Sequence, residues 1–380
     1  MIYMDAASTA PARQEVLDLV TPLLTSNFGN PASLHELGQQ AKRANDWART
    51  QVAASLDVQS GEIYFTSGGT EADNTAIIGA ALARPRGKVV VTSSIEHSAV
   101  LEACAYLVQF HGFEHREIPV DRTGLVDLIQ AAKLIDEHVA VVSVMAVNNE
   151  VGTIQPIAQV SELARAAGAV MHSDAVQAAG WLDLAVIASH VDAMSLSGHK
   201  IGALKGSGLL YFSNQYPVVP LLHGGGQQGG MRSGTENPAA AVGIARALQV
   251  CAEQRASGVG DGYGKYLIER ITKDLDAKGE GLVQLTGHDQ QRVGGIVSFV
   301  FPRTAGETVL IELERRGVLC SSGSACSAGN TDPSAVLTAM GYEAELAHTA
   351  VRLSFTRGIK ENELSQVASA VVATVTGLAV

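Results

Sequence analysis

Short apolar runs alternate with longer amphipathic segments through the first two thirds of the chain. Four runs have the length and composition of buried strands, namely residues 88–94, 139–147, 169–174 and 191–197. Two segments between them, 98–112 and 157–168, have apolar residues at helical spacing, and the second closes on Gly168, as helices often do. Strands that alternate with helices predict βαβ units and a mostly parallel sheet.

The pattern changes in the last third of the chain. A connecting segment leads into a helix, and a strand, a helix and a second strand are expected at 293–301, 306–317 and 350–355. We interpret this part as a smaller α+β domain. The predicted organisation is a large domain at 15–251 and a small domain formed by 1–14 and 252–380.

The composition is that of a globular protein large enough for two domains, with 380 residues, 46% hydrophobic and 17% charged. The net charge is −11 and no run of Lys and Arg could follow a phosphate backbone, so we expect no nucleic-acid partner. The start, "MIYMDAAST", lacks the features of a secretory leader, and the end, "LSQVASAVVATVTGLAV", lacks the basic flank of a membrane anchor. The four cysteines form no zinc or disulfide pattern, which indicates a cytoplasmic protein.

Polar residues directly after the predicted strands are candidates for a functional site, because ligands bind at the carboxyl ends of strands in open α/β sheets. In "FTSGGTEADN", a strand end runs into Gly68 and Gly69, then Thr70 and a helical pattern, which suits an anion at a helix N-terminus. A capped helix without a ligand explains these residues equally well. His97, at a strand-to-helix turn, and Asn149, after a buried strand, are candidates by position alone.

A further strand end carries a carboxylate. Asp174 follows a buried strand, and Gln177 lies one turn later, on the same face if a helix begins there. His172 and Asp174 also have the strand spacing of two metal ligands. No third ligand is placed to complete such a site, so we expect no metal.

The strand end at "SLSGHK" places Lys200 beside Ser197 and His199. Such a lysine can be merely solvated, but burial and cationic neighbours can lower its pKa until the neutral amine attacks a carbonyl. A lysine for an aldehyde, an anion cradle, a carboxylate for a pyridinium nitrogen and a flat group over a ring are together what pyridoxal phosphate needs. Their convergence at the strand ends predicts this cofactor.

Two nucleotide-binding folds are not favoured. The segment "HGGGQQG" (223–229) matches G-x-G-x-x-G, but it follows no clean strand and no helix opens at its third glycine. The motif G-x-x-x-x-G-K-[ST] does not occur, which excludes a P-loop NTPase.

These motifs, in this order, resemble those of the cysteine desulfurases of the NifS/IscS type, a branch of the class-V aminotransferases. The resemblance covers nearly the whole chain and rests on "MDAASTAP", "NFGNPASLH", "TSGGTEADN", "EHSAV", "NNEVG", "HSDAVQ", "SGHK", "GMRSGTEN", "SSGSAC" and "VRLSF". It implies the fold of the PLP-dependent transferases of fold type I. That fold is α/β, with a large domain whose mostly parallel mixed sheet is flanked by helices, and a smaller α+β domain.

The resemblance implies a role for each residue around the cofactor ring. Lys200 would hold pyridoxal phosphate covalently and later move the proton on the substrate's Cα. Asp174 would pair with the pyridinium nitrogen, and Gln177 would hydrogen-bond the ring hydroxyl. His97 would stack on the ring and could shuttle protons, and Asn149 would also contact the cofactor.

The resemblance also implies how the phosphate is held. Gly69, Thr70, Ser197 and His199 would bind it from within the chain. Thr235, in "RSGTEN", is similar to a residue that reaches the phosphate from a second subunit. The expected assembly is therefore a homodimer.

The expected reaction converts L-cysteine to L-alanine and passes the sulfur to a protein cysteine. Asn149 and Arg352 would bind the substrate carboxylate, and Asn30 would border the same pocket. In the family, the cysteine of "SSGSAC", here Cys326, accepts the sulfur, and the residues after it have the composition of a mobile loop. The persulfide would then supply a sulfur-acceptor protein such as an iron–sulfur scaffold. Cys320 ends the apolar run "GVLC" and is interpreted as structural.

Two alternatives stay open at this point. A selenocysteine lyase, or another β-elimination enzyme that depends on pyridoxal phosphate, would share the fold and the lysine. An inactive relative that serves as a protein-binding scaffold belongs to a different class, and retention of Lys200, Asp174, His97 and Cys326 argues against it. Alanine production from cysteine and from selenocysteine separates the first alternative from the expected function.

Overall fold

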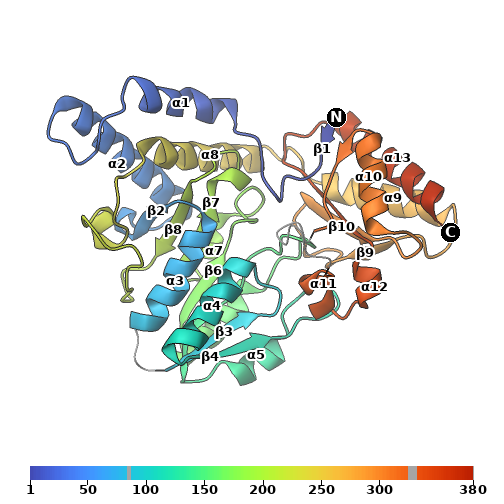
Figure 1. The fold of residues 1–380 in the computed structure, drawn as a ribbon, viewed down its shortest axis with the longest axis horizontal. Helices are drawn as coiled ribbons and strands as arrows, with labels where there is room; N and C mark the ends of the chain where they lie inside the picture. Colours follow the sequence, from blue (N-terminus) through green and yellow to red (C-terminus); the bar gives the residue numbers. More distant parts are fainter. Residues whose placement is uncertain (84–86, 324–331, 380) are drawn as a thin grey trace.

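A seven-stranded sheet forms the centre of the larger part of the molecule (Figure 1). The computed structural model describes residues 1–83, 87–323 and 332–379. Within them the sheet has the order β2-β8-β7-β6-β5-β3-β4. Its strands are β2 Ile63–Thr66, β3 Val89–Ser93, β4 Glu114–Ile118, β5 Val139–Ser143, β6 Val170–Asp174, β7 Ala193–Ser197 and β8 Gly208–Phe212. Neighbours from β4 to β7 are parallel, and β8 is antiparallel to both β7 and β2, which confirms the predicted mostly parallel sheet.

The predicted strands are β3, β5, β6 and β7, and every residue of each is buried. The strand expected at 139–147 ends earlier, at Ser143. Alternate side chains pack in opposite directions, with Val90 and Val141 in one apolar cluster and Val91 and Val142 in another. Because both faces are covered, these strands show continuous apolar runs rather than polar alternation.

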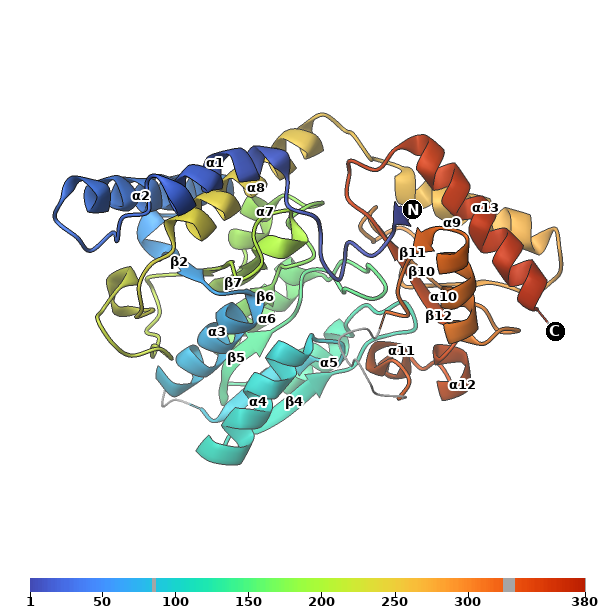
Figure 2. The same cartoon turned by 45° about the horizontal axis from the view of Figure 1, so that its top comes forward.

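Helices cover both faces of this sheet (Figure 2). One face packs against α3 Gly69–Ala83 and α4 Ser98–His111. The other packs against α1 Gln14–Thr25, α2 Glu36–Leu56, α5 Leu128–Leu134, α6 Ile157–Ala167, α7 Leu184–Ala188 and α8 Pro238–Ala256. The predicted helices at 98–112 and 157–168 are α4 and α6. Gly168 ends α6 with φ of 71°, a conformation that glycine adopts without strain.

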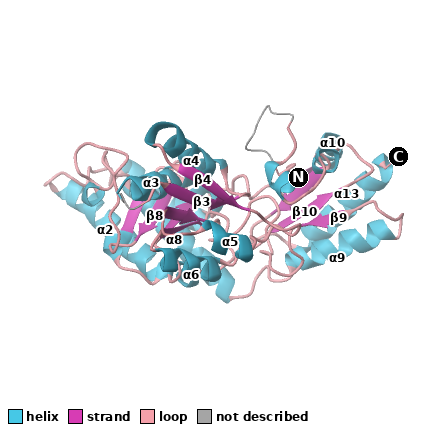
Figure 3. Cartoon of the chain, turned by 90° about the horizontal axis from the view of Figure 1, so that it is seen from below, coloured by secondary structure: helices cyan, strands magenta, loops and turns pink. Residues whose placement is uncertain are grey.

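A smaller antiparallel sheet lies beside the large one (Figure 3). It has the order β12-β10-β9, with β9 Gln284–Thr286, β10 Ile296–Val300 and β12 Ala350–Ser354. Next to it, β1 Ile2–Tyr3 pairs in parallel with β11 Val318–Leu319. The helices of this part are α9 Tyr263–Asp276, α10 Gly306–Arg315, α11 Ala335–Ala339, α12 Ala344–Ala347 and α13 Glu361–Leu378. This arrangement is the expected α+β part.

We propose that the domains follow the two sheets, with 15–251 around the large sheet and 1–14 and 252–380 around the small one. The first and last segments of the chain meet in the small part, through the β1–β11 pair and a bridge between Asp5 and Ser354. Helix α8 packs on α1 and α2 and continues to Ala256, so the expected boundary after residue 251 falls inside a helix.

Trp181 packs between the two parts. A Cβ added at Gly295, just before β10, would lie 2.0 Å from the indole, so only glycine allows the ring this close. Phe355 meets the same ring edge-on, with centroids 6.2 Å apart, and the Arg357 guanidinium lies 4.6 Å from its centroid. The edge-on ring contact and the guanidinium over the indole add directional contacts to the apolar packing between the two parts.

Among the helices in the described parts of the chain, none is both long enough and apolar enough to cross a membrane. Helix α13 carries the uncharged C-terminal run, and its buried residues Leu364, Val367 and Val371 pack in the core of the small part.

Candidate active site

A cavity of about 700 Å³ lies where the carboxyl ends of β5, β6 and β7 meet the N-terminal segment and β12. Most of the predicted site residues are in its wall: Gly69, Thr70, His97, Asn149, Asp174, Gln177, Ser197, His199, Lys200 and Arg352. The large sheet supplies most of these side chains from its strand ends. Arg352 comes from the small sheet, so the cavity lies between the two parts.

The turn between β2 and α3 forms one end of the cavity. Gly69 and Thr70 begin α3, where backbone N–H groups point out of the helix and its dipole is positive. A Cβ added at Gly208, on the adjacent strand, would lie 2.4 Å from the backbone of Gly68, so the turn approaches β8 closely. A Cβ at Gly69 would lie 3.0 Å from Val176 Cγ2. The turn therefore presents backbone donors to the cavity.

Asp174, the last residue of β6, is a buried carboxyl in the cavity wall. Its Oδ1 accepts a hydrogen bond from Val176 N at 2.9 Å. Burial raises the pKa of Asp174, and the nearby His97 and Lys200 side chains oppose that rise. A buried carboxylate with two potential cations beside it suits a positively charged ring nitrogen.

His97 and Gln177 are held at the cavity by the backbone. His97 is the N-cap of α4, and its Nδ1 accepts a hydrogen bond from Ala99 N at 3.1 Å. This bond assigns the proton to Nε2 in the neutral ring. Gln177 Nε2 donates to the carbonyl of Ala7 at 3.0 Å. These backbone hydrogen bonds fix the positions of both side chains at the cavity.

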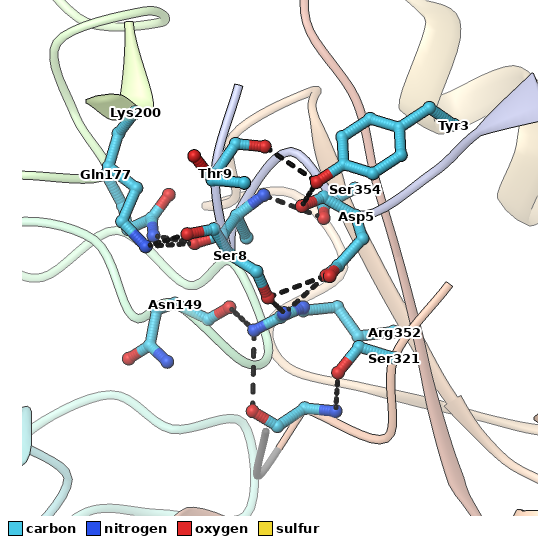
Figure 4. A network of polar contacts seen from close by, with 12 residues as sticks. Tyr3, Asp5, Ser8, Thr9, Asn149, Gln177, Lys200, Ser321, Arg352 and Ser354 are labelled. Carbon is cyan, nitrogen blue, oxygen red and sulfur yellow. Dashed lines mark hydrogen bonds and ion pairs between the residues drawn. The ribbon is translucent and has the colours of Figure 1, made fainter. Parts of the chain in front are cut away.

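Lys200 lies in the short 3-10 turn Gly198–Lys200 that follows β7. Its Nζ donates hydrogen bonds to the carbonyls of Ala7 at 2.6 Å and Ser8 at 2.8 Å (Figure 4). These acceptors come from the N-terminal segment, which crosses the cavity between the two parts. Sequence reasoning included this segment only as a resemblance motif and gave its residues no role.

His199 faces the same segment, since its Nδ1 lies 3.1 Å from Thr9 Oγ1. Burial, with the charges of Lys200 and Lys205 nearby, lowers the pKa of His199 to about 4. The imidazole is therefore neutral at neutral pH and acts as a hydrogen-bonding group rather than a charge.

Arg352 is the buried cation of the site, with 2% of its surface exposed. Its Nη2 donates to Asp5 Oδ1 and Ser8 Oγ, both at 2.8 Å, and its Nη1 donates to the Asn149 carbonyl at 3.0 Å (Figure 4). Its Nε is buried, with no hydrogen-bond partner in the described part of the chain. Asp5 is a residue that sequence reasoning missed, because its contact with Arg352 joins opposite ends of the chain.

The three described cysteines are poor thiolates. Burial raises the pKa of Cys104 and of Cys320 to about 12, and it also raises the pKa of Cys251. Nucleophilic cysteines need the opposite shift. Cys326, the predicted sulfur acceptor, lies outside the described residues.

Two further predicted site residues lie away from the cavity wall in this chain. Asn30 is exposed between α1 and α2, where its Oδ1 accepts a hydrogen bond from Ala32 N at 3.0 Å. The expectation that Asn30 borders the pocket is not met within one chain. Thr235 lines a separate cavity of about 230 Å³, which shares Ser67 and Gly206 with the main one.

In the described residues, no group of three or more His, Cys, Asp or Glu side chains is placed to hold a metal.

The fold and the cavity together define a class of protein. A mostly parallel sheet with one reversed strand, β8, next to its edge, a smaller antiparallel sheet, and a lysine at a strand end between them are the layout of fold-type I transferases. The family model for aminotransferase class-V matches residues 2–367. The chain therefore belongs to the class-V aminotransferase family, in its branch of NifS/IscS-type proteins.

Curated relatives match over most of their length. "Cysteine desulfurase IscS" of Methanosarcina thermophila is 41% identical over 363 residues, covering 94% of this chain and 87% of the relative. "Cysteine desulfurase NifS" of Azotobacter vinelandii is 38% identical over 374 residues, covering 96% and 90%. These identities confirm the family resemblance seen in the motifs.

Solved structures share the whole fold. A structure titled "NIFS-LIKE PROTEIN" superposes with a TM-score of 0.90 at 33% identity, covering 99% of this chain and 100% of that one. A structure titled "SspA in complex with cysteine" gives a TM-score of 0.82 at 31% identity, covering 94% and 99%. The fold-type I layout is therefore confirmed.

Proposed function

We propose that this protein is a cysteine desulfurase, which converts L-cysteine to L-alanine and takes up the sulfur on one of its own cysteines. One observation carries the proposal: a single cavity collects the Lys200 amine, the Asp174 carboxyl and the Arg352 guanidinium from three separate elements. An amino acid would present an amine, an acidic Cα–H and a carboxylate to such a site. The names of the curated relatives support the same activity.

We propose pyridoxal phosphate as the cofactor, and the residues present fit it. A phosphate suits the N-terminus of α3, which begins with Gly69 and Thr70, and Ser197 and His199 line the same cavity. Asp174 would pair with the ring nitrogen, with Gln177, His97 and Asn149 around the ring. Lys200 would hold the cofactor between turnovers, and the cofactor would supply an electron sink for the substrate's Cα.

The chain's own groups would do the rest of the work. The carbonyls of Ala7 and Ser8 aim Lys200 Nζ into the cavity, where it can take the Cα proton. Arg352 would bind the substrate carboxylate with its unpartnered Nε and one Nη, after exchanging its contact with Asp5. Asn149 lies beside that position.

We propose Cys326 as the sulfur acceptor, because partial or full burial raises the pKa of each of the other three cysteines of the chain. Its thiolate would form an S–S bond with the substrate sulfur while the Cβ–S bond breaks. The electron pair of that bond stays on the amino-acid carbon, which takes a proton and becomes alanine. The products are alanine and a Cys326 persulfide.

We further propose a homodimer in which Thr235 reaches the phosphate of the neighbouring site, and a cytoplasmic sulfur-acceptor protein, such as an iron–sulfur scaffold, as the partner. In this chain Thr235 lines a cavity next to the phosphate end of the main one, open to a group from outside. Asn30 would act only if the same assembly brings it to a pocket.

The proposed function is tested by incubating the purified protein with pyridoxal phosphate and L-cysteine. We expect one alanine per persulfide before any thiol is added, and alanine continuously when a thiol reductant is present. Selenocysteine is run in parallel, and a rate much higher than with cysteine would identify a selenocysteine lyase instead. If no alanine forms and the cofactor absorbance does not change, the proposal is refuted.

Replacing Arg352 with lysine tests the carboxylate site. We expect the KM for L-cysteine to rise about 10- to 100-fold, because lysine cannot make the paired contact of a guanidinium, which is a loss of about 1.5–3 kcal/mol. The KM for cysteamine, which lacks the carboxylate, should change much less. Steady-state rates of the variant and the unchanged protein with both substrates give the two KM ratios. Arg122→Lys, on the surface over Tyr342, is the matched control. An equal rise in KM for both substrates would contradict the assignment.

A further inference from the structure

A row of buried polar side chains lies under the cavity floor, and the proposed function does not use it. Asp73 is on the first turns of α3, Ser143 ends β5, His172 is in β6 and Ser195 is in β7. All four are buried, with at most 1% of their surface exposed. Polar groups that are this deeply buried cost free energy unless they are partnered, so their arrangement needs an explanation.

His172 connects the row. Its Nδ1 lies 2.8 Å from Ser143 Oγ and its Nε2 lies 2.9 Å from Ser195 Oγ. The same Nε2 is 3.6 Å from Asp73 Oδ1, which is buried and has no hydrogen-bond partner among the described residues. Asp73 also lines the cavity beside Asp174. Two carboxyls therefore share one floor, and His172, two residues before Asp174 on the same strand, lies next to both.

The histidine does not neutralise Asp73. The 3.6 Å contact would be an ion pair only if His172 carried a charge, but burial lowers the pKa of His172 to about 3. Its two ring nitrogens each contact a hydroxyl, and a hydroxyl can donate to one nitrogen and accept from the other, so both nitrogens of a neutral imidazole are satisfied. His172 is therefore a neutral neighbour of Asp73.

The groups that act on the two carboxyls differ. Burial raises the pKa of Asp73 well above its usual range, the charge of Asp174 raises it further, and Glu96 adds to this, with only the Ser195 hydroxyl opposing. Asp174 faces His97 and Lys200, which stabilise its charged form.

His97, in the turn before α4, acts on Asp174, and among the described residues that turn and α4 supply no other charge that would stabilise an ionised Asp73. Glu96, in that turn, is itself buried with a pKa of about 8, and it accepts hydrogen bonds from Ser93 Oγ and Met145 N. Cys104, on α4, is neutral because burial raises its pKa to about 12. Acids and neutral groups thus surround Asp73, whereas Asp174 has the cations.

We propose that Asp73 and Asp174 form a carboxyl pair on the cavity floor, in which Asp73 holds a proton and Asp174 is left as the anion for the ring nitrogen. Two close carboxyls in a site of low polarity do not ionise together, and the one without cationic neighbours keeps the proton. Asp73 is thus a positioning residue that acts through Asp174. The role of the anion rests on the proposed function, but the protonation of Asp73 does not.

The sign of the stability effect follows from the raised pKa. Between the pKa of an unfolded aspartate, about 4, and the higher pKa in the folded chain, the folded state binds more protons, so its stability falls as pH rises. Asp73→Asn removes this fall, because the amide has the shape of a protonated carboxyl and does not titrate. The variant should gain stability relative to the unchanged protein as pH rises.

Thermal unfolding of the purified, cofactor-loaded full chain at about pH 5 and about pH 8 makes the test. We expect the Tm of D73N minus that of the unchanged protein to increase by about 2 °C or more between these pH values. Glu71→Gln, on the same helix, is the matched control. Burial raises the pKa of Glu71, but hydrogen bonds from Arg232 and Ser67 outweigh it and lower that pKa. An acid with a lowered pKa changes stability only below its ordinary pKa, so the Tm of E71Q minus that of the unchanged protein should stay nearly constant between about pH 5 and about pH 8.

A Tm difference for D73N that stays constant, as in E71Q, or that falls with rising pH would overturn the proposal, and so would failure of D73N to fold when E71Q folds. The cofactor absorbance gives a second measurement. Removal of a neutral carboxyl should move the pH midpoint of that absorbance by less than about half a unit, whereas removal of a nearby charge moves it by about one unit or more. If the protein shows no cofactor absorbance, the proposed function fails, while the unfolding experiment still decides the protonation of Asp73.

Discussion

Lys200→Ala is expected to lower the turnover of L-cysteine by about 10³-fold or more, because one side chain would both hold the cofactor and move the Cα proton. The Ala7 and Ser8 carbonyls hold the Lys200 amine at the cavity, at 2.6 and 2.8 Å. Alanine formation and the visible absorbance of the bound cofactor measure the two roles separately.

The control for this variant is Lys265→Ala. Lys265 is exposed on α9, where it pairs with Glu269 at 3.8 Å, and its removal should leave the rate unchanged. Borohydride reduction followed by peptide mass analysis should attach the cofactor to Lys200 in the unchanged protein and to no lysine in the variant. Cofactor attached to a different lysine, with the rate preserved in K200A, would show that the assignment of Lys200 is wrong.

Cys326→Ser is expected to abolish persulfide formation and sulfide release while the cofactor absorbance stays. A serine hydroxyl is not ionised at neutral pH and makes no stable bond to sulfur, so the last transfer has no acceptor. Mass spectrometry of the protein after one turnover detects the persulfide. The spectral change on adding L-cysteine should persist, because substrate binding and Cα deprotonation do not need this thiol.

Cys320→Ala is the matched thiol control. Cys320 directly follows β11, packs partly against the small core, and has a pKa raised to about 12 by burial and by Asp5. We expect C320A to keep its activity and to lose about 1 kcal/mol of stability. An inactive C320A beside an active C326S would exchange the two roles and overturn the assignment.

The strands around the site could be predicted because burial on both faces leaves a continuous apolar run, as in β6 Val170–Asp174. Strand β4 Glu114–Ile118 was not predicted, because it lies at the sheet edge with only one neighbour and reads "EHREI". Its outer positions can be polar. Apolar periodicity does not detect such a strand.

The strand ends predicted the large-domain half of the site for a similar reason. Asp174, Ser197 and Lys200 follow neighbouring strands, and parallel strands bring their carboxyl ends to one edge. The Asp5–Arg352 pair and the Lys200–Ala7 hydrogen bond could not be predicted from local pattern, since each joins segments far apart in the chain. Asp73 was overlooked because it looks like an ordinary polar residue of a helix start.

The β1–β11 pair has a consequence for the order of folding. Ile2 pairs with Val318, so nearly the whole chain must be synthesised before the first strand has a partner. The large sheet spans 63–212 and can form earlier, because its contacts are closer in sequence. The carbonyls that orient Lys200 follow β1 directly. We therefore expect the cofactor to be captured late, by a nearly finished molecule, rather than to guide the chain as it folds.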